Sequence, residues 1–140
     1  MRCVQFKDVA LQSMWCEEDP EIRSRSAYVT HWQAGSRSSA AVYFEVDPGA
    51  RFGRHRHSAE ETIVVIEGDV ELTIGDETRA LNSGAVAVAP ALVRHDIRNV
   101  GQTTARCVGF WSSASVVSLW DKVLQPRNSR RAGTPIPEGV

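Results

Sequence analysis

Apolar and polar residues alternate along the middle of the chain, in short segments separated by turn residues. Residues 42–46 and 70–74 place apolar side chains at every second position, the period at which side chains of a strand share one face. Residues 62–66 form a dense β-branched run, which is typical of a strand buried on both faces. Further strand-like segments follow, at residues 84–89, 97–100 and 105–111. This pattern predicts an all-β fold with little helix, and it fits a sandwich as well as a closed barrel.

The two ends of the chain lack this pattern. Residues 1–25 are mixed and charged, and we interpret them as an N-terminal extension. Residues 26–120 carry the strand-like segments and are expected to form one compact β domain. Residues 121–140 are rich in Pro, Arg and Gly, which predicts a C-terminal arm or a disordered tail. We find no internal repeat and no long linker, so we expect a single domain.

Composition and charge narrow the classes of function. The 140 residues include 16 basic and 17 acidic side chains, for a formal net charge of -1 at pH 7. This balance gives no field that attracts nucleic acid or an anionic membrane, so neither is an expected partner. No apolar run approaches the roughly 18 residues of a membrane span. The charged N-terminus is unlike a signal peptide, so we expect a cytoplasmic protein.

Three histidines and a glutamate are the strongest candidates for chemistry. His55 and His57 are two positions apart, so in a strand both imidazoles point to the same face and can reach one ion. Glu61 follows after a short turn, and its carboxylate can return to that ion. His95 can supply a third imidazole from far downstream, whereas His31 has no ligand spacing and is expected to be structural. Three imidazole nitrogens and one carboxylate oxygen suit a divalent transition metal: iron, manganese, nickel, zinc, cobalt or copper.

Two spaced motifs contain these residues: Gly49-x5-His55-x-His57-x3-Glu61-x6-Gly68, and Gly84-x5-Pro90 followed by His95-x3-Asn99. Together they resemble the two motifs of the cupin superfamily, over about residues 40–112. The one departure is Leu92, which stands where a glycine is usual in the turn before the last histidine. The spacing in the family also selects Glu61 rather than Glu60 as the ligand.

The resemblance implies a fold, a ligand set and a cavity. The fold is a small single-domain bacterial cupin, an all-β barrel of the double-stranded β-helix or jelly-roll type, with its motifs at residues 49–68 and 84–99. Strand parity then predicts which side chains share the interior with the ligands. The expected substrate-binding residues are Phe44, Ile63, Val65, Ile97 and Asn99, with Tyr43 in place of Phe44 if the parity of that strand is reversed. These side chains would form a largely apolar cavity around the ion.

Cupins with a similar ligand set include dioxygenases, and some similar proteins accompany aromatic polyketide pathways. We therefore expect a metal-dependent enzyme that acts on a small organic substrate, with iron as the metal and dioxygenase or other oxidoreductase chemistry. A non-redox isomerase, lyase or decarboxylase is the alternative among enzymes, and a non-catalytic small-molecule-binding cupin is the alternative outside them. The resemblance also implies a homodimer, because cupins usually pair through sheet contacts.

Overall fold

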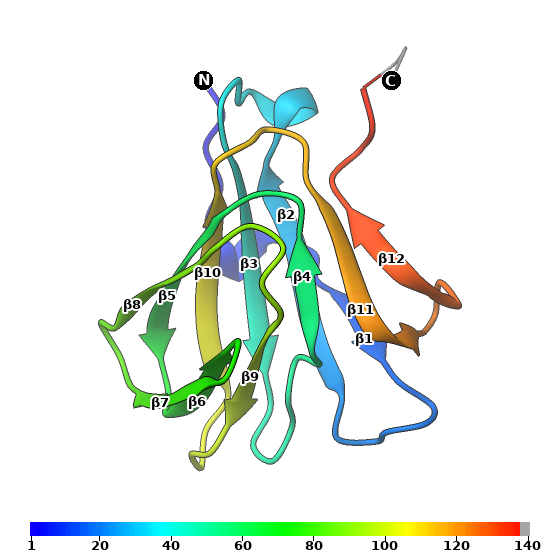
Figure 1. Cartoon of the computed structure of the whole chain (residues 1–140). Helices are drawn as coiled ribbons and strands as arrows, with labels where there is room; N and C mark the ends of the chain where they lie inside the picture. Colours follow the sequence, from blue (N-terminus) through cyan, green and yellow to red (C-terminus); the bar gives the residue numbers. More distant parts are fainter. Residues whose placement is uncertain (138–140) are drawn as a thin grey trace.

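The computed structural model describes residues 1–137 and consists almost entirely of strands (Figure 1). In chain order the strands are β1 (Gln12–Trp15), β2 (Arg23–Thr30), β3 (Ala40–Val46), β4 (His55–His57), β5 (Glu61–Glu67), β6 (Val70–Ile74), β7 (Glu77–Leu81), β8 (Val86–Ala89), β9 (His95–Asn99), β10 (Ala105–Trp111), β11 (Val117–Leu124) and β12 (Ser129–Gly133). Two short 3-10 helices, η1 (Phe6–Asp8) and η2 (Trp32–Ala34), complete the described elements. Neither is long and apolar enough to cross a membrane.

The strands form two six-stranded sheets that pack face to face. The first has the order β1-β2-β3-β10-β5-β8, and the second has the order β12-β11-β4-β9-β6-β7. Neighbouring strands within each sheet are antiparallel, and the chain passes from one sheet to the other after β3, β4, β5, β7, β8, β9 and β10. This arrangement confirms the predicted all-β jelly roll with little helix.

Alternation along the strands places the core between the two sheets. Ile63 and Val65 of β5 are buried while the residues between them are partly exposed, and Val70 and Leu72 of β6 follow the same rule. This is the burial expected when one face of each strand contacts a common interior. The three cysteines are free thiols, of which Cys3 is exposed and Cys16 and Cys107 are buried.

The N-terminal residues are part of the packed domain rather than a separate extension. β1 pairs with β2, and β2 already begins at Arg23, before the expected boundary at residue 26. On the outer face of the first sheet, Phe6 stacks on Tyr43 with 4.5 Å between ring centroids. Val4, Val9 and Leu11 pack against the same small outer cluster. The segment was expected to stand apart because its few apolar residues show no strand period, but they suffice to cover one sheet.

Strand pairing also continues past residue 120. β11 crosses that expected boundary, and β12 pairs with it inside the segment expected to be an arm or a disordered tail. The backbone N–H and C=O of Trp15 and Gln125 exchange hydrogen bonds of 3.2 and 2.7 Å, which join the start of the β11–β12 turn to β1 (Figure 1). Backbone hydrogen bonds rather than apolar alternation hold this segment, so its polar sequence gave no signal. Residues 138–140 of the expected tail lie outside the described residues.

Candidate metal centre

Three strands bring the four predicted ligands to one point inside the barrel. His55 and His57 lie on β4, Glu61 is the first residue of β5, and His95 is the first residue of β9. One ligand atom from each residue lies within 4.8 Å of the others, and all four side chains are buried. His55 is paired directly with His95 across β4 and β9, so sheet register fixes their approach. Glu60, in contrast, is exposed.

Hydrogen bonds to the other ring nitrogen orient each imidazole. His55 Nδ1 donates to the Gly53 carbonyl at 2.6 Å, and His95 Nδ1 donates to the Val93 carbonyl at 3.0 Å. His57 Nδ1 is hydrogen-bonded to the Ser118 hydroxyl at 2.6 Å. These contacts leave the Nε2 atoms toward the centre of the cluster. Partners of this kind fix the tautomer and ring orientation of histidines that bind metals.

The donor atoms fit a divalent metal ion. Glu61 Oε1 lies 3.1 Å from His95 Nε2 and 3.3 Å from His57 Nε2. Within residues 1–137, His57 Nε2 is nevertheless buried without a hydrogen-bond partner. A buried polar atom without a partner is costly, and coordination to an ion would satisfy it. This set of three imidazoles and one carboxylate can hold a divalent transition metal.

Gly109 of β10 makes room for the Glu61 carboxylate. A Cβ atom added at Gly109 would overlap Glu61 Oε2 and would lie 3.0 Å from Glu61 Cδ. The carboxylate therefore occupies space that any other residue at this position would fill. The sequence carried a weak signal, since a glycine within an apolar strand often marks a close approach of another group.

Leu92 keeps the turn geometry before His95. Its φ of 68° lies in the left-handed region that favours glycine, which is the residue usual at this position of the motif. The Leu92 N–H donates to the His57 carbonyl at 2.9 Å, and its side chain is exposed. Leu92 therefore adopts the left-handed backbone that a glycine adopts readily, and its exposed side chain meets no obstacle there.

Burial and the neighbouring charges set the protonation of the cluster. Burial lowers the pKa of His55 well below its ordinary value, and the nearby His95 and His57 lower it further. Burial also lowers the pKa of His57, although the Glu61 carboxylate opposes this. Burial alone would raise the pKa of Glu61, but the close contacts of its carboxylate with the His57 and His95 imidazoles outweigh it, and the pKa is lowered. Neutral imidazoles beside a carboxylate are the forms that bind metal.

These directions predict how the stability of the metal-free protein depends on pH. Because the pKa values of His55 and His57 are lower in the folded protein than the ordinary 6.5, the unfolded chain binds protons first as the pH falls. The free energy of unfolding should therefore decrease below about pH 6.5, and Glu61 should add to the decrease as the pH falls through its own lowered pKa. Denaturant unfolding with chelator at about pH 8 and about pH 5.5 measures this. Equal stability at both values would contradict the pKa directions, and His55→Gln should weaken the dependence.

The ligands line a cavity of about 1120 Å³ between the sheets. Of the predicted substrate-binding residues, Phe44, Ile63 and Ile97 line it. Phe44 rather than Tyr43 faces inward, as the first choice of parity predicted. In the described chain, Val65 and Asn99 are buried but do not line this cavity.

The Asn99 side chain instead forms hydrogen bonds with backbone groups. Its amide nitrogen donates to the carbonyls of Val46 and Thr103, both at 2.8 Å, and its amide oxygen accepts from the Gly101 N–H at 2.8 Å. All of these partners belong to loops or strand ends. The side chain therefore fastens the turn after β9 and has no free group for a substrate.

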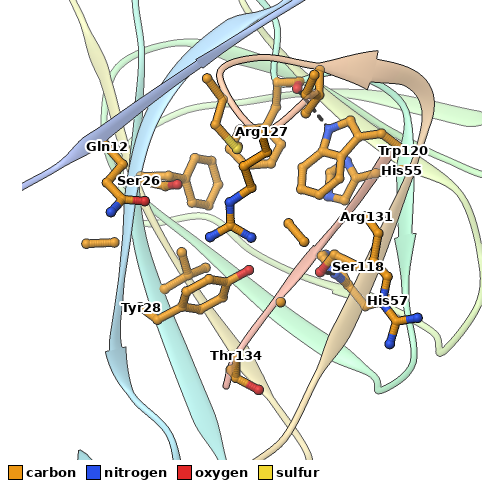
Figure 2. A pocket seen from close by; sticks show the side chains of 18 of the residues that line it. Gln12, Ser26, Tyr28, His55, His57, Ser118, Trp120, Arg127, Arg131 and Thr134 are labelled. Atoms are coloured by element: carbon orange, nitrogen blue, oxygen red, sulfur yellow. Dashed lines mark hydrogen bonds between the residues drawn. The ribbon is translucent and has the colours of Figure 1, made fainter. Parts of the chain in front are cut away.

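Several lining residues were not found by sequence reasoning. Figure 2 shows Tyr28 of β2, Ser118 of β11 and Arg127 of the β11–β12 turn around the same space. Burial raises the pKa of Tyr28 to about 12, while the positive charge of Arg127 acts in the opposite direction. Ser24 and Ser26 precede Tyr28 on the same face of β2, but Arg23 and Arg25 at the alternate positions are polar as well, so the sequence shows no alternation that would single out this face.

Two tryptophans frame the histidines. The His55 ring stacks on Trp120 with 4.8 Å between centroids, and the His57 ring meets the Trp111 ring edge-on at 5.0 Å. Trp120 Nε1 donates to the Phe52 carbonyl at 3.3 Å. Trp111 Nε1 is buried without a partner within the described chain, so an unused donor lies in a residue that lines the cavity.

The family profile for the cupin domain matches residues 42–111, which contain all four clustered ligands. The chain belongs to the cupin family. This cupin is 35% identical over 83 residues to protein SchB of Streptomyces halstedii, covering 59% of this chain and 60% of that one. It is 39% identical over 62 residues to polyketide synthase CurC of Streptomyces cyaneus, covering 44% of this chain and 40% of that one. The matches thus span less than two thirds of either relative.

Solved structures share the fold at lower identity. The polyketide cyclase RemF of Streptomyces resistomycificus matches this cupin with a TM-score of 0.64 and 22% identity, over 79% of this chain and 78% of that one. Oxalate decarboxylase of Lactobacillus farciminis, in complex with formate, matches with a TM-score of 0.68 and 17% identity, over 79% of this chain and 33% of that one. At these identities the likeness shows the cupin fold alone.

Proposed function

We propose that this cupin is a metal-dependent enzyme that promotes bond formation through an enolate of an aromatic or poly-carbonyl small molecule. The observation that carries this proposal is that Tyr28 and the His55, His57, Glu61 and His95 cluster line one cavity. The relative named as a polyketide synthase and the fold shared with a polyketide cyclase support the choice of substrate class. A homodimer and a cytoplasmic location stay predictions.

The size and walls of the cavity agree with such a substrate. Its volume of about 1120 Å³ lies at the upper end of small-molecule sites, which are typically about 300–1000 Å³. Phe44, Ile97 and Trp111 contribute apolar and aromatic surface near the ligands. A flat multi-ring or extended poly-carbonyl molecule can therefore be bound largely by apolar contact, while a few polar groups orient it.

Two kinds of polar group act on the substrate in this proposal. A divalent ion held by the four ligands would act as a Lewis acid toward a substrate carbonyl or enol oxygen. The Tyr28 hydroxyl donates a hydrogen bond to a second substrate oxygen, the carbonyl oxygen at the carbon to which the enolate carbon adds. The enolate forms when the adding carbon loses a proton to solvent, and the oxygen, which gains negative charge as the new bond forms, takes up a proton from solvent. Because burial raises the pKa of Tyr28 to about 12, this donor stays protonated at neutral pH. The buried Trp111 N–H is a further donor without a partner in the described chain.

Iron-dependent dioxygenation, predicted from the sequence, is the second candidate. The observation that favours it is a set of three imidazoles and one carboxylate beside an apolar cavity with room for a substrate and dioxygen together. The two candidates differ in their need for oxygen. Turnover of a poly-carbonyl aromatic probe without air would support enolate chemistry, whereas turnover only with oxygen uptake by the iron-loaded protein would support dioxygenation. No turnover with any metal would leave a small-molecule-binding cupin.

Replacing Tyr28 by phenylalanine tests the first candidate directly. We expect kcat to fall about 10- to 100-fold with bound metal unchanged, because one donor to a developing oxyanion is lost. Tyr43→Phe is the matched control, since the Tyr43 hydroxyl lies on the outer face and donates to Glu45. Steady-state kinetics and elemental analysis of both variants measure the effect. Unchanged turnover by Tyr28→Phe would contradict the role proposed for the Tyr28 hydroxyl.

A further inference from the structure

We propose that Arg127 binds an oxyanion of the substrate, a carboxylate or a phosphate, inside the same cavity. The inference rests on the proposed function, because it adds an oxyanion to the features of the substrate that this cavity would bind. It adds a group that lies outside the metal cluster and outside the segment matched by the cupin profile.

The fold directs Arg127 into the cavity. The residue lies in the turn between β11 and β12, and Figure 2 shows its guanidinium pointing into the space bordered by Tyr28 and Ser118. The turn is held at its start, where Gln125 exchanges two backbone hydrogen bonds with Trp15 of β1. The Gln125 side chain also donates to Asn128 Oδ1 at 3.1 Å, across the turn that contains Arg127. Both contacts hold the turn in place at the edge of the cavity, and the Arg127 side chain itself is exposed.

The guanidinium has no carboxylate partner in the described residues. Several other arginines of this chain do have such a partner, for example Arg25 with Asp47 at 2.8 Å and Arg94 with Asp121 at 3.0 Å. Arg127 forms no such ion pair with any side chain of residues 1–137, and the same holds for Arg131, which also lines the cavity. Five N–H donors on a planar group are therefore available for a ligand.

The charge of the cavity wall favours an anion. Among its described lining residues the one acidic side chain is Glu61, whose carboxylate already contacts His57 and His95. Two arginines and a divalent ion bound at the cluster would make the interior strongly positive. A positive electrostatic potential inside a cavity with apolar walls raises the local concentration of anionic ligands. Arginine adds geometry to this attraction, because its fork matches the two oxygens of a carboxylate or phosphate.

Three aromatic probes test the inference by equilibrium binding to the metal-loaded protein. They share one ring system and carry a carboxylate, a phosphate monoester or a neutral amide, and quenching of tryptophan fluorescence reports their binding. We expect one or both anions to bind about 10- to 100-fold more tightly than the amide. Whichever anion is preferred identifies the source of the oxyanion. Equal affinity for all three probes would overturn the proposal.

Variants separate Arg127 from other causes of anion preference. In Arg127→Gln the preference should disappear while the affinity for the amide stays unchanged. Arg79→Gln is the matched control, since it removes the same charge from an exposed site outside the cavity lining, and it should retain the preference. An anion preference that survives in Arg127→Gln would assign it to the metal or to Arg131 and overturn the proposal. Because the assay measures binding without turnover, it tests Arg127 even if the proposed enzyme activity is not found.

Discussion

Replacing His57 by alanine is expected to remove most of the bound metal and leave a folded barrel. His57 Nε2 is a buried ligand atom without a hydrogen-bond partner in the described chain, so its removal takes a ligand from the ion. It also leaves the buried Ser118 hydroxyl without its His57 Nδ1 partner, which should lower stability modestly without unfolding the barrel. Loss of a partner that merely orients a ligand costs about 10- to 100-fold in metal affinity, so loss of the ligand should cost at least about 100-fold. Elemental analysis of the variant purified without chelator measures the effect.

His31→Ala provides the matched control for this prediction. His31 is the remaining histidine of the chain, and its ring accepts a hydrogen bond from the Gln33 N–H at 3.3 Å rather than joining the cluster. Its removal should leave the metal content unchanged. Circular dichroism of both variants should show the strand signal of the parent protein. An undiminished metal content of His57→Ala would contradict the assignment of His57 as a ligand.

Gly109→Ala is expected to damage the metal centre without altering any ligand. The new methyl group would fall on the Glu61 carboxylate and lie 3.1 Å from Val42 Cγ1. The carboxylate must then rotate away from His57 and His95, which leaves its charge poorly paired in a buried site. We expect a loss of about 1–3 kcal/mol in the free energy of unfolding, as for other overpacked cores, together with weaker metal binding. Denaturant unfolding and metal titration measure the two effects.

A double-mutant cycle assigns the cost of Gly109→Ala to Glu61. In a Glu61→Ala background the space that the carboxylate fills is empty, so the same substitution should destabilise the protein much less. The cycle compares unfolding free energies of the metal-free proteins, so that metal affinity does not enter. Equal costs in the two backgrounds would place the clash at Val42 instead and remove the role given to Gly109.

The parts of the molecule that sequence predicts well are those with local signals. The strand segments follow a period of two residues, and His55, His57 and Glu61 are close enough in sequence for strand geometry to bring them together. Parity tells which face a side chain takes but not how far along the barrel it lies. For this reason Ile63 was placed correctly beside the cavity, while Val65, one step further along the same face, packs in the core away from it.

The residues that sequence reasoning missed depend on contacts between distant segments. Arg127 lines the cavity because its turn is hydrogen-bonded to Trp15, a pairing that no local pattern records. Tyr28 belongs to a strand whose inward face carries Ser24 and Ser26 before it, so it gave no apolar signal. The role of Gly109 arises only once the Glu61 carboxylate is placed above it. Each requires knowledge of which strands become neighbours.

The cavity draws its two halves from different stretches of the chain. All four clustered ligands lie within residues 42–111, the segment shared with the cupin family, whereas Tyr28 and Arg127 lie before and after it. The ligand set and the two polar contacts that we propose for Tyr28 and Arg127 can therefore diverge separately during evolution. Changes confined to the two ends would alter these contacts while the ligand set and the apolar walls stay in place.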